Sequence, residues 1–206
     1  MNRRSRRSRG KTEEFLGWSS IVATIATVIL ALTALVTVYI TVSAWGDKRD
    51  SDRPYFTLKD SPKVVQTPEL NFEFKFFNVG IHPAVNLRSR TLVFNQNLSM
   101  PPIHKDEFAL VNEIPKDTSS SLVISIAKSE IDPNRKNIDP NFIVIDLSYV
   151  DPILKKPFAQ SIFLKWNGVI NGQIQPLVHL RLEEKDKIMD YLKKQGFELQ
   201  NPQPGY

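Results

Sequence analysis

The sequence contains no cysteine, and among its 206 residues it has only eight glycines and three histidines. Without cysteine no disulfide can form, so the folded part must be held by an apolar core, which about 150 residues can supply. The glycines form neither a phosphate-binding loop nor a dinucleotide-binding run, and no GxSxG motif occurs. His82, His104 and His179 lie on separate segments, so no zinc site is predicted.

Carboxylates are not arranged as a recognisable site either. The loop that begins at Asp132 matches a calcium-binding loop at its first and third positions, but Lys136 occupies the fifth and Ile143 the twelfth. Alternation within an apolar strand directs Asp146 to the solvent, and Asp151 begins a turn. The sequence therefore predicts no catalytic residue, no cofactor and no metal ligand.

Basic residues are concentrated at the N-terminus, where the first eleven positions hold six of the 27 lysines and arginines. From Asp47 onward the chain has 21 basic and 20 acidic residues, so this part is nearly neutral. The formal net charge of +5 is thus a property of a short tail. Nucleic-acid binding by the folded domain is not predicted.

A run of 31 uncharged residues over positions 15–45 predicts a transmembrane helix, because about 20 apolar residues already cross a hydrocarbon core of roughly 30 Å. Trp18 and Trp45 bracket the run as membrane-interface anchors in the lipid bilayer. Basic residues before the run outnumber those after it, where aspartates are interleaved. The positive-inside rule therefore predicts a cytoplasmic N-terminus and an extracytoplasmic C-terminal domain.

Other interpretations of this N-terminal segment fit less well. A cleavable signal, with a cleavage site at residues 42–44, would have a shorter apolar core. A twin-arginine signal would precede a less apolar segment, and a pilin-like leader would place the apolar run directly after a small residue, whereas Gly10 is followed by four polar residues. A domain that faces the cytoplasm as a membrane-tethered adaptor stays an alternative.

Small or partly polar residues recur along one face of the predicted helix, from Ser20 to Thr41, at alternating spacings of four and three. Such a stripe lets two membrane helices approach closely, although Ala and Thr are frequent throughout the run. A homo-oligomer formed through this helix is therefore a hypothesis, and its contact residues would be Thr24, Thr27, Ala31 and Ala34.

The remaining chain predicts a mainly β domain. In residues 70–77 apolar and polar side chains alternate, as in an antiparallel strand that covers a core. Further strands are predicted at 54–59, 87–94, 108–111, 122–127, 142–150, 158–166 and 172–180, and the strands at 142–150 and 158–166 would form a hairpin. Seven or eight short strands in this length favour an immunoglobulin-like antiparallel β-sandwich.

One helix is predicted over residues 181–195, with Gly196 as its C-cap. Its apolar face is narrow and consists of Leu182, Ile188, Met189 and Leu192. We expect this helix to lie against the end or edge of the sandwich and to shield an open strand. The alternative is a docking helix for a partner.

The predicted organisation is then a basic cytoplasmic tail at 1–14, a transmembrane helix at 15–45, a polar stalk at 46–53, a β-sandwich at 54–179, a C-terminal helix at 180–196 and a flexible tail at 197–206.

The stretch FFNVGIHPAVNL joins two predicted strands and concentrates residues with special backbone properties. Gly80 can adopt the positive φ of a tight corner, Asn78 can cap the turn, Pro83 fixes the exit and Ala84 permits close strand packing. His82 alone has no structural role in this scheme. The stretch is therefore interpreted as a corner rather than a binding loop, with His82 as its one residue of functional interest.

The motifs RPYF, NVGIHPAVN and LSYVDPILKKPF, behind a basic tail and one membrane helix, resemble a loose group of bacterial single-pass membrane proteins of unknown function. In that group an NxGxxPAxN corner and a YxD hairpin recur in an Ig-like exported domain. The resemblance covers residues 53–166 and implies a bacterial envelope setting but no catalytic residue. This chain departs from it at Lys155 and Lys156, where the group often has glycine.

Together these features predict a non-enzymatic, membrane-anchored module in the bacterial inner membrane that binds an envelope protein or scaffolds an assembly. The alternative is a hydrolase or metal-dependent enzyme whose site is assembled from scattered residues such as His82, His104 and Asp151. That alternative requires these side chains to meet in a concave pocket.

Overall fold

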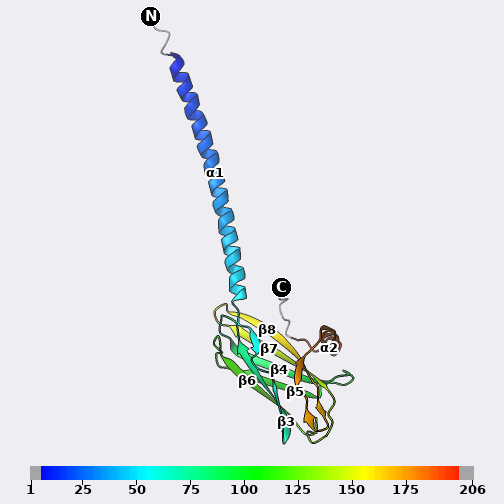
Figure 1. Ribbon diagram of the computed structural model, residues 1–206. Helices are drawn as coiled ribbons and strands as arrows, with labels where there is room; N and C mark the ends of the chain where they lie inside the picture. Colours follow the sequence, from blue (N-terminus) through cyan, green and yellow to red (C-terminus); the bar gives the residue numbers. More distant parts are fainter. Residues whose placement is uncertain (1–5, 200–206) are drawn as a thin grey trace. The chain divides into compact units, whose positions relative to one another are not determined.

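The computed structural model describes residues 6–199, which fall into two compact units, one ending at Ser51 and the other beginning at Asp52. The first unit is one helix, and the second is a β domain that ends in a helix (Figure 1). The prediction of a mainly β chain with an apolar N-terminal helix and one C-terminal helix is confirmed. Parts of the predicted basic and flexible tails, residues 1–5 and 200–206, lie outside the described residues.

The first unit is the helix α1, Arg6–Ser51. Its Ser20–Gly46 portion has a mean hydropathy of 2.6 and is long and apolar enough to cross a membrane. The helix exceeds the predicted bounds 15–45 at both ends, and the predicted stalk is helical as far as Ser51. Proline first occurs at Pro54, where its ring disfavours a helical residue in front of it, so no proline interrupts the helix earlier.

The threonine hydroxyl groups in the apolar part of α1 are satisfied within the helix. Each donates a hydrogen bond of 2.7 to 2.9 Å to the carbonyl four residues earlier, at Thr24, Thr27, Thr33, Thr37 and Thr41. The predicted stripe therefore needs no second helix to satisfy its threonines. Trp18 and Trp45 are both exposed, and the Arg49 guanidinium lies 4.9 Å from the centre of the Trp45 ring.

The second unit contains two large antiparallel sheets and a small one of two strands. The first is built around β3 (Glu69–Asn78), with β6 (Ser119–Ile126) along one edge. The opposite edge of β3 pairs with β1 (Phe56–Leu58) near one end and with β2 (Lys63–Thr67) near the other. The sequence did not predict strand β2, because its five residues show no clear alternation of apolar and polar side chains.

The second sheet has the strand order β11-β8-β7-β4-β5. These strands are β4 (Val85–Asn95), β5 (His104–Leu110), β7 (Asn141–Asp151), β8 (Lys156–Trp166) and β11 (Leu177–His179). The predicted hairpin is formed by β7 and β8, which pair along their whole length. The strand predicted over 172–180 is divided by Pro176: its first part, β10 (Gln173–Ile174), pairs with β9 (Val169–Ile170), and its last part is β11.

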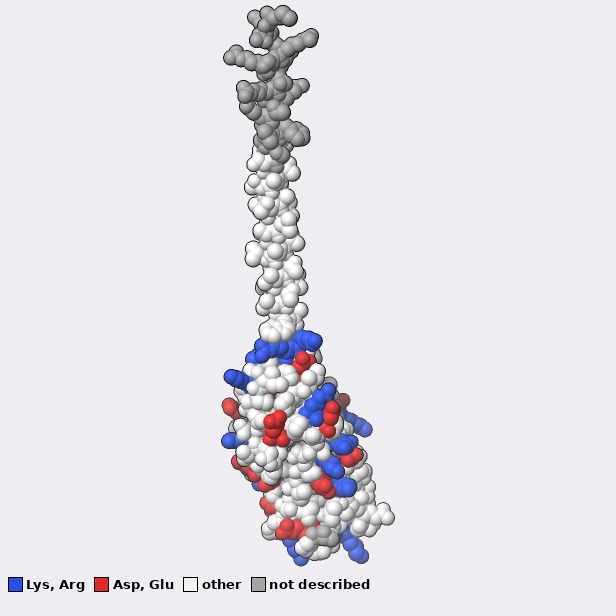
Figure 2. Space-filling model, turned by 90° about the vertical axis from the view of Figure 1, so that its left-hand side faces the viewer, with Lys and Arg blue, Asp and Glu red and all other residues white. Residues whose placement is uncertain are grey.

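The main apolar core lies between the two sheets. The alternating side chains of β3, Leu70 to Phe76, are at most 2% exposed and pack with residues of β7 and with Trp166. Figure 2 shows Lys and Arg interspersed with Asp and Glu on one face of this domain. The charge pattern therefore agrees with the nearly neutral composition of the chain beyond residue 46.

The C-terminal helix α2, Leu182–Lys194, covers the outer face of the second sheet, whereas the sequence analysis places it at the end or edge of the sandwich. Ile188 and Leu192 are buried in a second apolar cluster with residues of β4 and β7, namely Leu92, Phe94, Phe142 and Val144. Burial on both faces of β7 explains its nearly continuous apolar sequence.

The rest of the apolar face predicted for α2 is open. Leu182 is 73% exposed and Met189 is 37% exposed. Gly196 follows the helix with a φ of +73°, as a C-terminal glycine does. Phe197 and Leu199, which fall in the predicted flexible tail, pack against the second cluster, so that prediction is wrong for residues 197–199.

Candidate functional site

The connection between β3 and β4 carries the chain from one sheet to the other, and Asn78 is its centre. The Asn78 side chain is fully buried. Its Oδ1 accepts hydrogen bonds from the backbone N–H of Tyr55 at 3.2 Å and of Gly80 at 3.0 Å. Its Nδ2 donates to the carbonyl of His82 at 2.9 Å and lies within 3.4 Å of the carbonyls of Ile114 and Pro115. One amide thus joins the corner, the segment after α1 and the loop before β6.

Gly80 is required by space and not by its backbone angles, which corrects the sequence interpretation. The φ of Gly80 is not positive, and the residue near this corner that has a positive φ, +55°, is Asn86. A Cβ on Gly80 would lie 2.2 Å from the carbonyl oxygen of Arg53. At Ala84 the chain also lies close to a neighbouring segment, because its backbone exchanges two hydrogen bonds with that of Ile114.

His82 has a structural partner that the sequence did not indicate. Its Nδ1 lies 2.7 Å from Oδ2 of Asp151, and the Asp151 side chain is fully buried. The other carboxylate oxygen of Asp151 accepts hydrogen bonds from the N–H groups of Ile153 and Leu154 in the β7–β8 turn. The backbone N–H of His82 donates to the carbonyl of Asp52 at 2.9 Å. The pair therefore braces the corner, the β7–β8 turn and the segment that follows α1.

The other two histidines, His104 and His179, do not join this pair. The Nδ1 of His104 contacts Glu130 at 2.8 Å, and His179 lies on β11. Among the described residues, no group of three histidine or carboxylate side chains is placed to hold a metal ion. Asp146, expected at the solvent face, is buried on the outer face of the second sheet, where it bonds Arg90 and Ser161.

Tyr149 fixes the same N-terminal segment from the β7 side. Its hydroxyl donates a 2.9 Å hydrogen bond to the carbonyl of Pro54, and its ring packs edge-on against Phe56 at 5.0 Å between centroids. Burial raises the pKa of Tyr149 to about 12 from the ordinary 10.0, because the phenolate would lose its hydration. The neutral phenol is therefore the form that the fold stabilises.

We expect this pKa to produce a selective loss of stability at alkaline pH. The folded domain binds the phenolic proton more tightly than the unfolded chain, so this stabilisation is complete below about pH 10 and is lost as the pH rises through about 12. Urea unfolding should show that the wild type loses about 1 kcal/mol more between pH 9 and 11 than Tyr149→Phe does. Equal pH slopes for the two proteins would contradict this role.

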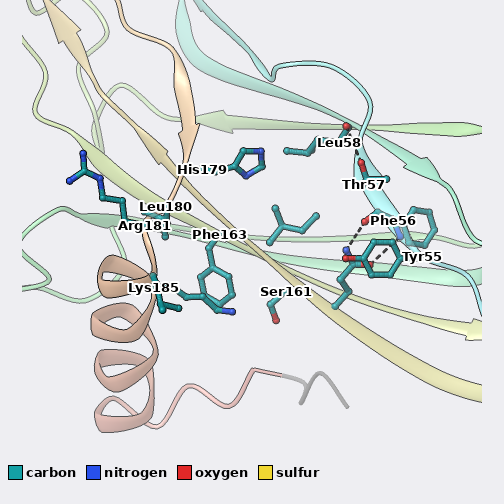
Figure 3. Close-up of a pocket in the computed structure, with 13 residues that line it drawn as sticks. Tyr55, Phe56, Thr57, Leu58, Ser161, Phe163, His179, Leu180, Arg181 and Lys185 are labelled. Atoms are coloured by element: carbon teal, nitrogen blue, oxygen red, sulfur yellow. Dashed lines mark hydrogen bonds between the residues drawn. The ribbon is translucent and has the colours of Figure 1, made fainter. Parts of the chain in front are cut away.

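A groove opens in the β domain beside the segment 52–55. It has a volume of about 520 Å³ and continues into a second hollow of about 260 Å³. Three stretches of consecutive residues line the larger part: 55–58 with β1, 160–163 in β8, and 179–182 from the end of β11 to the start of α2. Figure 3 shows Phe163 and Lys185 on the α2 side, with Tyr55 and Phe56 across from them.

The groove is basic and aromatic. Its lining includes His179, Arg181 and Lys185, and Arg53 borders the smaller hollow, whereas no aspartate or glutamate of the described chain lines either part. The Lys185 ammonium lies 5.3 Å from the centre of the Phe163 ring. The positive charges of Arg53, Arg181 and Lys185 lie among apolar and aromatic side chains, a combination that suits an anionic ligand with apolar groups.

One acidic side chain, Glu184, lies near the start of α2 but does not line the groove. Lys165 donates a 2.9 Å hydrogen bond to Glu184, and this bond lowers the pKa of the Glu184 carboxyl. The other carboxylate oxygen of Glu184 accepts a 3.2 Å hydrogen bond from the backbone N–H of Arg181, whose charge also lowers the pKa of this carboxyl, so Glu184 interacts with both Lys165 and Arg181.

The sequence does not indicate the groove, because the wall at residues 55–58 lies more than 100 positions before the other walls in the chain. None of these segments carries a motif. The chain matches no protein-family model, and no curated protein matches it significantly.

Proposed function

We propose that this protein is a single-pass protein of the bacterial inner membrane whose β domain is a non-enzymatic binding module outside the cytoplasm. The observation that carries the proposal is the groove between β1, β8 and α2, which combines aromatic side chains with three cations, Arg53, Arg181 and Lys185, and, within residues 6–199, no carboxylate. Aromatic residues and arginine are enriched where proteins bind one another. A protein of the cell envelope is the partner that fits such a surface in a membrane-anchored domain.

We further propose that the domain is an immunoglobulin-like sandwich. Support comes from the order of its strands, since β1 and β2 together, β3 and β6 form one sheet, and β5, β4, β7 and β8 follow one another in the second. In the lettering of such domains these are strands A, B and E against C′, C, F and G. The β3–β4 corner then corresponds to the crossing from strand B to strand C.

The membrane topology is testable with reporters. We expect alkaline phosphatase fused after Tyr206 to be active in a bacterial host, and green fluorescent protein fused there through the general secretion route to stay dark, because the basic residues precede α1. Replacing Arg3, Arg4, Arg6 and Arg7 by glutamine should lower the exported fraction. An active cytoplasmic reporter and an inactive phosphatase would support the adaptor alternative and contradict the proposal.

Partner binding at the groove is testable because the chain has no cysteine, so a single introduced cysteine can be labelled uniquely. We expect full-length His179→Cys, carrying a maleimide-benzophenone label at the groove, to form adducts with another protein when irradiated in membranes. The control is Val123→Cys, which is 56% exposed on β6 and outside the groove. No adduct with His179→Cys, or the same adducts with both variants, would contradict a binding groove.

The enzyme alternative has one observation in its favour, the contact between His82 and Asp151. That carboxylate is engaged with the β7–β8 turn, and the hydrogen bonds of His82 within the described chain involve Asp52, Asn78 and Asp151, without a hydroxyl nucleophile. A bracing role accounts for each of these contacts. Binding at the groove is therefore the function that we prefer.

A further inference from the structure

Two open strand edges border the groove. Strand β8 pairs with β7 over Lys156–Trp166, but β11 pairs with it only over Leu164–Trp166. Over residues 156–163, the described chain therefore provides no strand on the other edge of β8. Strand β1 pairs, among the described strands, with β3 alone. Open edges invite the addition of another strand, and soluble domains usually protect them.

Between β8 and β1, the side chain of Gln160 already makes hydrogen bonds of the kind that an added strand would make. The backbone N–H of Phe56 donates to Oε1 of Gln160 at 3.1 Å, and Nε2 of Gln160 donates to the carbonyl of Phe56 (Figure 3). The hydrogen-bonding groups of Phe56 thus point away from β3 and toward β8. Because strand geometry repeats every two residues, Leu58 presents its backbone groups on the same side, within the groove.

The charges that surround these edges are of one sign. Among the described residues, Arg53 and Lys185 have no carboxylate partner within ion-pair distance, and each lies over an aromatic ring, Phe158 and Phe163 respectively. An acidic ligand would therefore meet two cations that are positioned but not neutralised.

We propose that the groove binds an extended, acidic segment of a partner protein, which adds as a strand to the open edge of β8 and directs carboxylates toward Arg53 and Lys185. This inference rests on the proposed function and names its ligand. Backbone hydrogen bonds to the open edge supply the affinity, and the basic rim selects acidic side chains. An anionic lipid headgroup satisfies the charges but has no backbone to pair with a strand edge, so the two open edges favour the peptide.

The test uses the full-length chain in phosphatidylcholine nanodiscs. A displayed library of random ten-residue peptides is selected for binding, with counter-selection against Arg53→Glu/Lys185→Glu. We expect the recovered peptides to be rich in Asp and Glu and to bind at least tenfold more weakly to Arg53→Gln/Lys185→Gln. The charge-matched control for the counter-selected variant is Lys116→Glu/Lys128→Glu, two lysines outside the groove, which should bind normally.

Strand addition is tested with synthetic copies of a recovered peptide that are N-methylated at alternate residues. Methylation of the set that faces β8 should weaken binding at least tenfold, and methylation of the other set should leave it unchanged. Recovered peptides without an acidic bias, no groove-dependent peptide, or equal effects of the two methylation sets would overturn the inference.

Nanodiscs that also contain about one third phosphatidylglycerol show whether anionic lipid or acidic peptide is the ligand of the basic rim. Loss of peptide binding in these discs alone would assign the basic rim to lipid and overturn the inference. If peptide selection fails while His179→Cys still forms its protein adducts, the ligand class is wrong and the binding function stands. If both fail, both proposals fall.

Discussion

Asn78→Ala is expected to destabilise the β domain by about 3 kcal/mol or more. The substitution removes a fully buried amide and leaves the N–H groups of Tyr55 and Gly80 and the carbonyl of His82 without their partner. A buried backbone group that loses its hydrogen bond costs about 1 to 3 kcal/mol. Three such groups meet at one side chain, so the loss should be among the largest that a single substitution causes in this domain.

Urea unfolding followed by the fluorescence of Trp166 measures this loss. Trp166 is fully buried in the β domain, and replacing Trp18 and Trp45 by phenylalanine makes it the sole tryptophan of the full-length chain in micelles. Asn97→Ala is the matched control, because the Asn97 side chain bonds its neighbour Ser99 at an exposed turn. If Asn78→Ala cost no more than this control, Asn78 would not be the centre of the corner.

Gly80→Ala is expected to cost about 3 kcal/mol or more, or to prevent folding. The added Cβ would lie 2.2 Å from the carbonyl oxygen of Arg53, 2.6 Å from Cα of Pro54 and 2.6 Å from the N atom of Tyr55. All three atoms belong to backbone, so no side-chain rotation can relieve the contact. The segment 53–55 must move away, and the hydrogen bond from Tyr55 to Asn78 breaks with it.

Gly172→Ala separates this steric effect from the loss of glycine's backbone freedom. Gly172 has a φ of +78°, but apart from its two chain neighbours no residue of the described chain has a heavy atom within 4 Å of the position that a Cβ would take there, so its replacement should cost only about 1 kcal/mol. The same tryptophan fluorescence compares the two variants. Equal costs would mean that the corner relaxes around the added methyl group without strain and that close packing is not why glycine is present at position 80.

The corner and the groove share the segment that follows α1. Asn78, His82 and Tyr149 hold residues 52–55 to the β domain through their hydrogen bonds to Tyr55, Asp52 and Pro54. Tyr55 in turn lines the groove. We therefore expect Asn78→Ala to weaken binding at the groove as well as stability, because it frees one of the groove's walls.

The local sequence pattern was sufficient to predict elements in which each face has the same environment along its whole length. Alternation in β3 predicts a strand with one buried face, and β3 has it because every second side chain enters the same core. The 31-residue uncharged run predicts a long apolar helix, and α1 contains one. The prediction that Asp146 is exposed was wrong. Alternation places Asp146 on the outer face of the sheet, but it does not indicate that the C-terminal segment covers that face.

The sequence by itself therefore determined the apolar helix, the mainly β domain and the corner between β3 and β4, because each depends on residues within a few positions of one another. Only the tertiary structure decided that His82 meets Asp151, that α2 covers a sheet face and that a basic groove lies between β1, β8 and α2. These features depend on contacts between residues that are far apart in the chain. Such contacts follow from how the two sheets pack, and no local periodicity encodes them.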